Sequence, residues 1–389
     1  MDSPPIVLLP VPLPVPLPAP QPAPTRAPAF RVQRTDFAGI DAVALTGGRS
    51  GSRAVFALRG ATLLAWEVVD GGDTVALTDG YRDAAELDSQ DGVRNGVLAP
   101  FTNRIADARY SFDGRDHDLL PGISTAAGRV VYHGFLRDMA LRVIDTRESD
   151  TGAEVLFSGA IEPEDHAGYP FALALTVRVR FSATGLGFVV TATNVGEQAA
   201  PYAAGWHPYF RLGEAPIDTL ELTVPATRSI VTDSRLLPLP GAAARSPVAD
   251  GPLPDFRVAR VLGRDVIDGC YAGLIPDGDG LVRSRLRDPA SGRQLSVWQR
   301  GGLVHVFTGD TLARDPRRAL AIEPVETMTD AFNRADCTAA LRLAPGQSRS
   351  FAFGAEFVAA TPTSPPSDTP CATAVASGPH EQTKGVRHP

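Results

Sequence analysis

A regular alternation of apolar and polar side chains between residues 171 and 181 is the clearest pattern in the chain. The apolar positions are Phe171, Leu173, Leu175, Val177, Val179 and Phe181. Small or polar residues stand between them, namely Ala172, Ala174, Thr176, Arg178 and Arg180. Successive side chains of a strand point to opposite faces of its sheet, so this pattern predicts a half-buried antiparallel strand.

Short turns rich in glycine, serine and proline connect further segments of strand character. Residues 187–194 follow a turn at 182–185, and segments 281–287 and 294–298 flank a turn at 289–292, which predicts two hairpins. Other strand-like runs are 54–69, 153–161, 219–224, 303–308 and 350–358. No segment between them shows twelve or more residues of helical periodicity. We therefore predict an all-β protein, a large antiparallel sandwich.

The two ends of the chain differ from its middle in composition. The first 29 residues contain eleven prolines, and residues 361–389 are rich in Pro, Ser, Thr and Ala without periodicity. Proline does not continue a helix, and no basic residue precedes the early apolar run, so this start does not resemble a signal peptide. We expect a proline-rich disordered tail at 1–30, one β-sandwich domain at 31–359 and a disordered tail at 360–389.

Charge and cysteine content narrow the classes of function. The net charge of −7 argues against a nucleic-acid partner, which usually requires a concentrated basic face. The three cysteines, Cys270, Cys337 and Cys371, form no CxxC pair and give no even disulfide framework. We expect free thiols in a reducing compartment, a cytoplasmic location, no membrane partner and no metal site.

Two segments place an ionisable residue in an unusual setting. His207 lies among aromatic residues in Gly205-Trp206-His207-Pro208-Tyr209-Phe210, and ring faces of this kind pack against the C–H faces of sugars. Glu323 precedes a proline at the end of an apolar run, where extended geometry can direct a carboxylate into a cleft. A core histidine and a solvated acidic loop are the alternative interpretations.

Two loops and one strand supply further candidates. Asn103 and Arg104 can offer hydrogen-bond donors to sugar hydroxyls, or can tie their own loop to its neighbours. His133 lies in a second polar loop, followed by a glycine. His305 alternates onto the same strand face as Leu303 and Phe307, so we expect it to be structural.

Six segments of the chain, in order, resemble the motifs of the aldose 1-epimerase (galactose mutarotase) family over nearly all of residues 31–358. They are 103–105 with the following 107–114, then 133–135, 169–171, 207–210, 268–271, and 323–324 with 330–333 downstream. Each motif is short, but their order across residues 103–333 makes the resemblance specific. It implies a galactose mutarotase-like β-supersandwich, in agreement with the strands found above.

The resemblance also implies roles for individual residues. Glu323 would be the general base that takes the proton of the anomeric hydroxyl, and His207 the general acid that protonates the ring oxygen. Asn103, Arg104, His133 and Asp268 would bind the sugar, with no metal and no other cofactor. Glu326 offers a second carboxylate near Glu323, but the pre-proline setting favours Glu323. Near Asp268, Gly269 and Cys270 depart from the bulkier or more polar residues that we expect there.

Several alternatives stay open at this point. The partner is expected to be a small aldose, but galactose, glucose, arabinose and xylose are not distinguished. A mutarotase for sugar phosphates would require a cationic clamp, which no arginine cluster identifies. A non-catalytic sugar-binding module would not require both His207 and Glu323. A glycoside hydrolase could use Asp268 with Glu323, but would leave the histidine motifs unexplained. The sequence does not indicate whether the protein is a monomer or a homodimer.

Overall fold

The alternating segment folds into the long hairpin that its pattern predicts. Strands β11 (Leu173–Ser182) and β12 (Gly185–Asn194) pair antiparallel, with Val177 opposite Val190. The computed structural model describes residues 28–47, 51–123 and 129–359. Apart from residues 28–30, the predicted tails lie outside these ranges, and β1 (Phe30–Phe37) begins one residue before the expected start of the domain.

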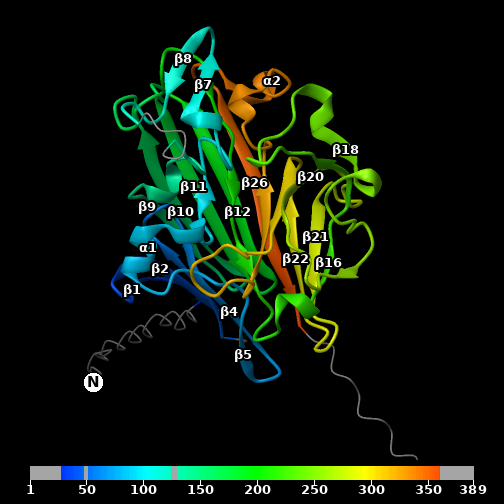
Figure 1. Ribbon diagram of the computed structural model, residues 1–389. Coiled ribbons are helices and arrows are strands. Elements are labelled where there is room, and N and C mark those ends of the chain that lie inside the picture. Colours follow the sequence, from blue (N-terminus) through cyan, green and yellow to red (C-terminus); the bar gives the residue numbers. More distant parts are fainter. Residues whose placement is uncertain (1–27, 48–50, 124–128, 360–389) are drawn as a thin grey trace, which may run out of the picture.

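The hairpin belongs to a nine-stranded antiparallel sheet that forms one layer of the molecule (Figure 1). From edge to edge its strands are β19 (Arg260–Val261), β16 (Glu221–Thr223), β21 (Val282–Arg287), β22 (Gln294–Gln299), β26 (Ser348–Val358), β12, β11, β10 (Gly152–Ile161) and β9 (Arg142–Glu148). Both predicted hairpins and the expected strands at 153–161, 219–224 and 350–358 lie in this sheet. β26 joins its two halves, because it pairs with β12 on one side and with β22 on the other.

A five-stranded sheet covers one half of this layer. Its strands, in order, are β1, β2 (Ile40–Gly47), β3 (Ser52–Ala57), β4 (Leu63–Asp70) and β5 (Asp73–Ala76). The single run expected at 54–69 is therefore two strands. Gly60, with φ of 66°, lies in the turn between them, and a Cβ at this position would lie 2.5 Å from the backbone oxygen of Arg137.

An eight-stranded sheet covers the other half and carries Asp268, His305 and Glu323 on its strands. Its order is β18 (Arg245–Pro247), β17 (Ala226–Ile230), β20 (Asp268–Leu274), β23 (Leu303–Phe307), β24 (Leu320–Val325), β14 (Gly205–Trp206) and β6 (Val97–Leu98), with β15 (Tyr209–Phe210) also on β24. Two ribbons complete the strands, β7 (Arg109–Phe112) with β8 (Arg115–Asp118) and β13 (Ala200–Pro201) with β25 (Arg342–Leu343).

Helices are few and short in the described part of the chain. The α-helices are α1 (Ala84–Ser89) and α2 (Thr338–Leu341). Single 3-10 turns are η1 (Asp91–Val93), η2 (Ala106–Ala108), η4 (Leu136–Asp138), η5 (Ile217–Thr219), η6 (Gly241–Ala244), η7 (Val248–Asp250) and η8 (Ala331–Asn333). None of these helices has the length and apolar character needed to cross a membrane.

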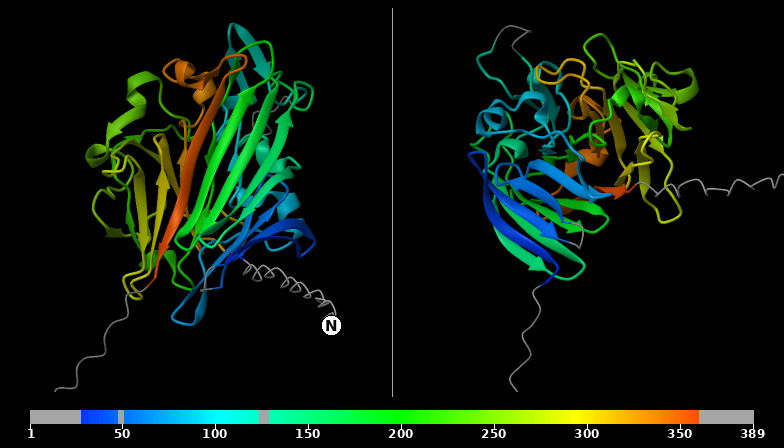
Figure 2. Two further views of the ribbon diagram at one scale, coloured as in Figure 1. Left: turned by 180° about the vertical axis from the view of Figure 1, so that it is seen from behind. Right: turned by 90° about the horizontal axis from the view of Figure 1, so that it is seen from below.

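The three large sheets share one hydrophobic core. Phe188 of β12 lies at their junction, where it contacts Phe56 of β3, Trp206 of β14 and Phe353 of β26, at ring-centroid distances of 5.9, 4.7 and 5.4 Å. The second view in Figure 2 shows the five-stranded sheet stacked on the part of the large sheet that contains β10–β12. The predicted antiparallel β-sandwich is therefore confirmed, and the eight-stranded sheet packs through Trp206 against the same core.

Candidate active site

A cavity of about 460 Å³ lies against strands β20, β23 and β24 of the eight-stranded sheet. The six residues singled out from the sequence all line it, namely Asn103, Arg104, His133, His207, Asp268 and Glu323. Residues 89–93, Thr311 and Leu312 form a further part of the wall. This volume lies within the range of small-molecule sites. The fold thus brings polar groups separated by more than two hundred residues into one cavity.

His207 lies between β14 and β15, two short strands that both pair with β24, the strand that carries Glu323. This arrangement holds Nε2 of His207 3.4 Å from Oε1 of Glu323. Both side chains are buried, with 8% and 2% of their surface exposed. The ring of Tyr209 stacks on that of His207, with 5.0 Å between centroids and 22° between planes. The histidine and the carboxylate therefore form a fixed pair on the cavity wall.

Burial sets the charge of this pair. It lowers the pKa of His207 to about 3, and the charge of His305 acts in the same direction. Burial raises the pKa of Glu323 to about 8, against the opposing attraction of His305. At pH 7 the pair therefore holds one proton, which rests on Glu323 while His207 is neutral.

Asn103 and His133 fix each other across two loops. Both have left-handed backbones, with φ of 53° and 62°. The backbone N–H of Asn103 donates to Nδ1 of His133 at 3.1 Å, and the backbone N–H of His133 donates to the Asn103 carbonyl at 2.7 Å. Because Nδ1 accepts a hydrogen bond, the proton of the neutral imidazole is on Nε2, which can donate to a ligand. Burial lowers the pKa of His133 well below its usual value, and the charge of His207 adds to this effect.

The turn that presents His133 depends on the next residue. Gly134 has φ of 68°, and a Cβ at this position would lie 2.1 Å from the backbone oxygen of Ala99. Only glycine fits this close approach without displacement of the backbone. The glycine that follows His133 in the sequence therefore has a specific structural reason.

Arg104 and Asp268 form a looser pair at the edge of the cavity. The guanidinium of Arg104 donates to the side-chain oxygen of Asn103 at 3.0 Å and to the backbone oxygen of Arg235, also at 3.0 Å. It lies 4.0 Å from a carboxylate oxygen of Asp268, and 5.3 Å from the ring centroid of Tyr132. Asp268 has 33% of its side chain exposed, so its carboxylate is accessible from the cavity.

His305 corrects the interpretation of the sequence. We expected it to be structural because it shares a strand face with Leu303 and Phe307, but Phe307 itself lines the cavity, and so does His305. Nε2 of His305 lies 2.8 Å from Oδ1 of Asp268. The alternation located the correct face of β23. It did not reveal that this face borders a cavity, because Val304 and Val306 fill the core on the other side.

Glu326, the second candidate base, is directed elsewhere. Its carboxylate accepts a hydrogen bond from the backbone N–H of Ala204 at 2.7 Å, and it does not line the cavity. The departures near Asp268 also have local explanations. A Cβ at Gly269 would lie 2.5 Å from the side chain of Leu253, and Cys270 lies opposite His305 in the β20–β23 pairing.

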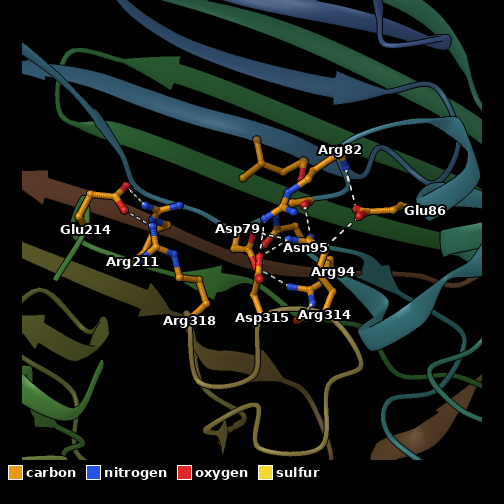
Figure 3. Close-up of polar contacts among 12 residues, drawn as sticks. Asp79, Arg82, Glu86, Arg94, Asn95, Arg211, Glu214, Arg314, Asp315 and Arg318 are labelled. Carbon is orange, nitrogen blue, oxygen red and sulfur yellow. Dashed lines mark hydrogen bonds and ion pairs between the residues drawn. The ribbon is translucent and has the colours of Figure 1, made fainter. Parts of the chain in front are cut away.

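A buried ion pair between Arg94 and Asp79 (Figure 3) lies next to Tyr209, the residue whose ring stacks on His207. The guanidinium of Arg94, 1% exposed, donates to Asp79 at 2.6 Å and lies 5.4 Å from the ring centroid of Tyr209. Arg314 binds the other oxygen of Asp79 at 3.1 Å, and its backbone oxygen accepts from Arg94 at 2.8 Å. This network ties the connection between β23 and β24, which carries part of the cavity wall, to the rest of the fold.

Comparison with known protein families identifies one family that spans most of the chain. The model of the family described as Aldose 1-epimerase matches residues 41–354. The chain belongs to the aldose 1-epimerase family. The resemblance found from six short motifs is therefore confirmed, and members of this family are sugar mutarotases.

Individual relatives agree with this assignment. This aldose 1-epimerase family member is 28% identical to the uncharacterized protein YihR of Escherichia coli K12 over 240 residues, which cover 61% of this chain and 71% of YihR. The crystal structure of a GalM/aldose epimerase homologue from C. elegans has 20% identity and a TM-score of 0.70, and covers 83% of this chain and 100% of that one. A galactose 1-epimerase from Lactobacillus acidophilus has 15% identity and a TM-score of 0.69, with 86% and 100% covered. These two structures confirm the galactose mutarotase-like fold.

Proposed function

We propose that this protein is a mutarotase that interconverts the α and β anomers of a free aldose, such as galactose or glucose. The contact that carries this proposal is the 3.4 Å approach of His207 Nε2 to Glu323 Oε1 in a cavity lined by further polar and charged side chains. Opening a hemiacetal requires one group that takes the proton of the anomeric hydroxyl and another that gives a proton to the ring oxygen. A histidine and a carboxylate side by side can do both.

In the proposed reaction Glu323 is the base and His207 the acid. Glu323 removes the proton from the anomeric hydroxyl while His207 protonates the ring oxygen, and the ring C–O bond breaks to give an aldehyde. Rotation about the C1–C2 bond exposes the other face of the aldehyde. As the ring closes on the other face, His207 takes the proton back from the hydroxyl that attacks the aldehyde, and Glu323 returns its proton to the former carbonyl oxygen. Both groups regain their starting states, so the step needs no metal, redox cofactor or co-substrate.

The proton shared by Glu323 and His207 must move from the carboxyl group to the imidazole before this reaction starts. In the empty site it rests on Glu323, because burial raises that pKa to about 8 and lowers that of His207 to about 3. Hydroxyl groups of a bound aldose that donate to the carboxylate favour its ionised form. Sugar binding would thus transfer the proton to His207 and prepare the pair for catalysis.

The other cavity residues supply donors and acceptors for the sugar ring. His133 presents a donor at Nε2, Arg104 presents its guanidinium at the edge, and the partly exposed carboxylate of Asp268 accepts. Asn103 holds His133 and Arg104 in place, because it forms a hydrogen bond with each of them. These groups would orient the anomeric carbon toward the acid–base pair.

Polarimetric relaxation of fresh α-D-galactose and α-D-glucose tests the proposal. We expect the wild type to accelerate relaxation and His207→Ala and Glu323→Gln to lose about 10²-fold or more, the usual contribution of general acid–base groups. Glu326→Gln is the matched control, because it removes a half-buried carboxyl group three residues away that does not line the cavity. It should keep most of the activity.

Two results would overturn this proposal. If Glu326→Gln lost the activity and Glu323→Gln kept it, the base would be Glu326 and not Glu323. A folded wild type that binds free aldoses but accelerates none of them would favour a binding role. A parallel assay with glucose 6-phosphate would identify a sugar-phosphate mutarotase instead.

A further inference from the structure

His305 lies at the centre of the strands that form the cavity wall. It is on β23, and its cross-strand neighbours are Cys270 on β20 and Glu323 on β24. Residues directly opposite each other in antiparallel strands have Cβ atoms about 4.5–5.5 Å apart, so the imidazole is a close neighbour of the Glu323 carboxyl group. The acid–base mechanism above gives this histidine no part.

The imidazole has a direct partner in Asp268. Nε2 of His305 lies 2.8 Å from one oxygen of this carboxylate, and the other oxygen lies 4.0 Å from the guanidinium of Arg104. The side chain of His305 is 10% exposed, and that of Asp268 is 33% exposed. The carboxylate of Asp268 therefore lies between the buried imidazole of His305, at hydrogen-bond distance, and the more distant guanidinium of Arg104.

The charged and titratable groups around His305 come from every element packed against it. Asp268 and Cys270 face it from β20, Glu323 from β24, and the remaining groups, Arg104, His133 and His207, from the loops. Burial alone would lower the pKa of His305, but the charge of an ionised Glu323 and the hydrogen bond to Asp268 outweigh it and raise the pKa well above its usual value. While Glu323 is protonated, the hydrogen bond to Asp268 and the charge of this carboxylate still raise the pKa of His305. Burial would raise the pKa of Asp268, yet the bond to His305 keeps it below its usual value.

We propose that His305 is a positioning residue: as an imidazolium bonded to Asp268, it orients that carboxylate and supplies the positive charge beside Glu323. The role rests on the proposed mutarotase function, but the charge state of His305 does not. The imidazolium favours the ionised form of Glu323, the form that accepts the anomeric proton. It acts on the reaction through these two carboxylates and takes no proton from the sugar.

His305→Gln separates charge from hydrogen bonding, because the amide can still donate to Asp268 but carries no charge. A unit charge at about 6 Å, in surroundings with an effective dielectric constant of about 20, shifts a neighbouring pKa by about one to two pH units. The acidic limb of kcat/KM should therefore move up by that amount. At pH 7 we expect kcat/KM to fall about 10- to 100-fold, with the loss shrinking severalfold at pH 9 after subtraction of the spontaneous rate.

The matched control is His117→Gln, which removes a histidine on β8 that stacks on Tyr110, away from the cavity. It should leave the pH profile unchanged. A His305→Gln enzyme with an unshifted profile, or with an equal loss at every pH, would overturn the proposal. Such a uniform loss is what a merely structural role produces.

An NMR titration of the histidine side chains tests the charge without relying on catalysis or on the variant folding well. In the wild type, the His305 imidazole should remain protonated from pH 5 to 8, while those of His133 and His207 remain neutral. In Asp268→Asn the His305 signal should titrate at a lower pH. A neutral His305 at pH 7 in the wild type would overturn the proposal, whereas a protonated His305 in an enzyme without mutarotase activity would leave the charge assignment intact and refute only the function.

Discussion

Glu323 is a carboxyl group that the fold buries at a cost in stability. Its side chain is 2% exposed, and burial raises its pKa from 4.5 to about 8. A raised pKa in the folded state means that folding favours the protonated form of Glu323. The stability of the fold is therefore highest, with respect to this group, below pH 4.5, and it falls as the pH rises to about 8. We therefore expect Glu323→Gln, which stays neutral at every pH, to stabilise the protein at neutral pH.

The size of the effect follows from the same two values. In the unfolded chain Glu323 ionises with its ordinary pKa of 4.5, whereas in the folded protein it stays protonated up to about pH 8. This difference lowers the free energy of unfolding of the wild type by about 3 kcal/mol at pH 7, but by less than about 0.5 kcal/mol at pH 4.5. Glutamine has nearly the same shape and can still donate to His207, so little packing is lost. The variant should be about 2 to 3 kcal/mol more stable at pH 7, and almost equal to the wild type at pH 4.5.

Urea unfolding followed by tryptophan fluorescence, with both proteins at pH 4.5, 6 and 7.5, measures this difference. The low-pH pair of curves is the internal control, because at pH 4.5 the wild-type carboxyl group is protonated in the folded protein and still half protonated in the unfolded chain, so its ionisation changes the stability little. Equal midpoints at pH 7.5, or a difference that does not change with pH, would refute the reasoning. The same variant should have lost the proposed base, so a gain in stability and a loss of activity are expected together.

Three further substitutions test how the site is supported, each by urea unfolding. Gly134→Ala should destabilise the protein by about 1 kcal/mol or more and lower its activity, because φ is positive and the added Cβ meets the backbone oxygen of Ala99. Arg94→Met should cost about 3 to 5 kcal/mol, because it leaves the buried carboxylate of Asp79 without its closest partner. Phe188→Ala should cost about 3 to 5 kcal/mol, because its ring contacts all three large sheets. A change below about 0.5 kcal/mol in any of them would contradict its reason.

Local patterns in the sequence predicted much of the fold. The alternation at 171–181 fixes which side chains of β11 face the core, and turn residues marked both hairpins of the large sheet. The run at 54–69 was not divided correctly, because its apolar residues continue through a turn whose left-handed backbone is not visible in the hydrophobic pattern. The order of strands within each sheet could not be derived, because it depends on long-range pairing.

The sequence identified individual residues of the candidate site but not their arrangement in space. Motif order identified six residues, and the structure places all six around one cavity. His305 was misjudged, because the sequence shows which face of a strand a residue shares but not whether that face meets a core or a ligand site. The pairings of β20 with β23 and of β23 with β24, which bring it beside Asp268 and Glu323, join segments far apart in the chain.

The position of β26 has a consequence for the order of events during synthesis. This strand comes last in the described chain, yet it lies inside the nine-stranded sheet between β12 and β22. A nascent chain that ends before residue 348 has no partner to join the two halves, and exposes two unpaired strand edges. The nine-stranded sheet can therefore close only after residues 348–358 have been synthesised, and until then its two open edges can pair with strands of other chains.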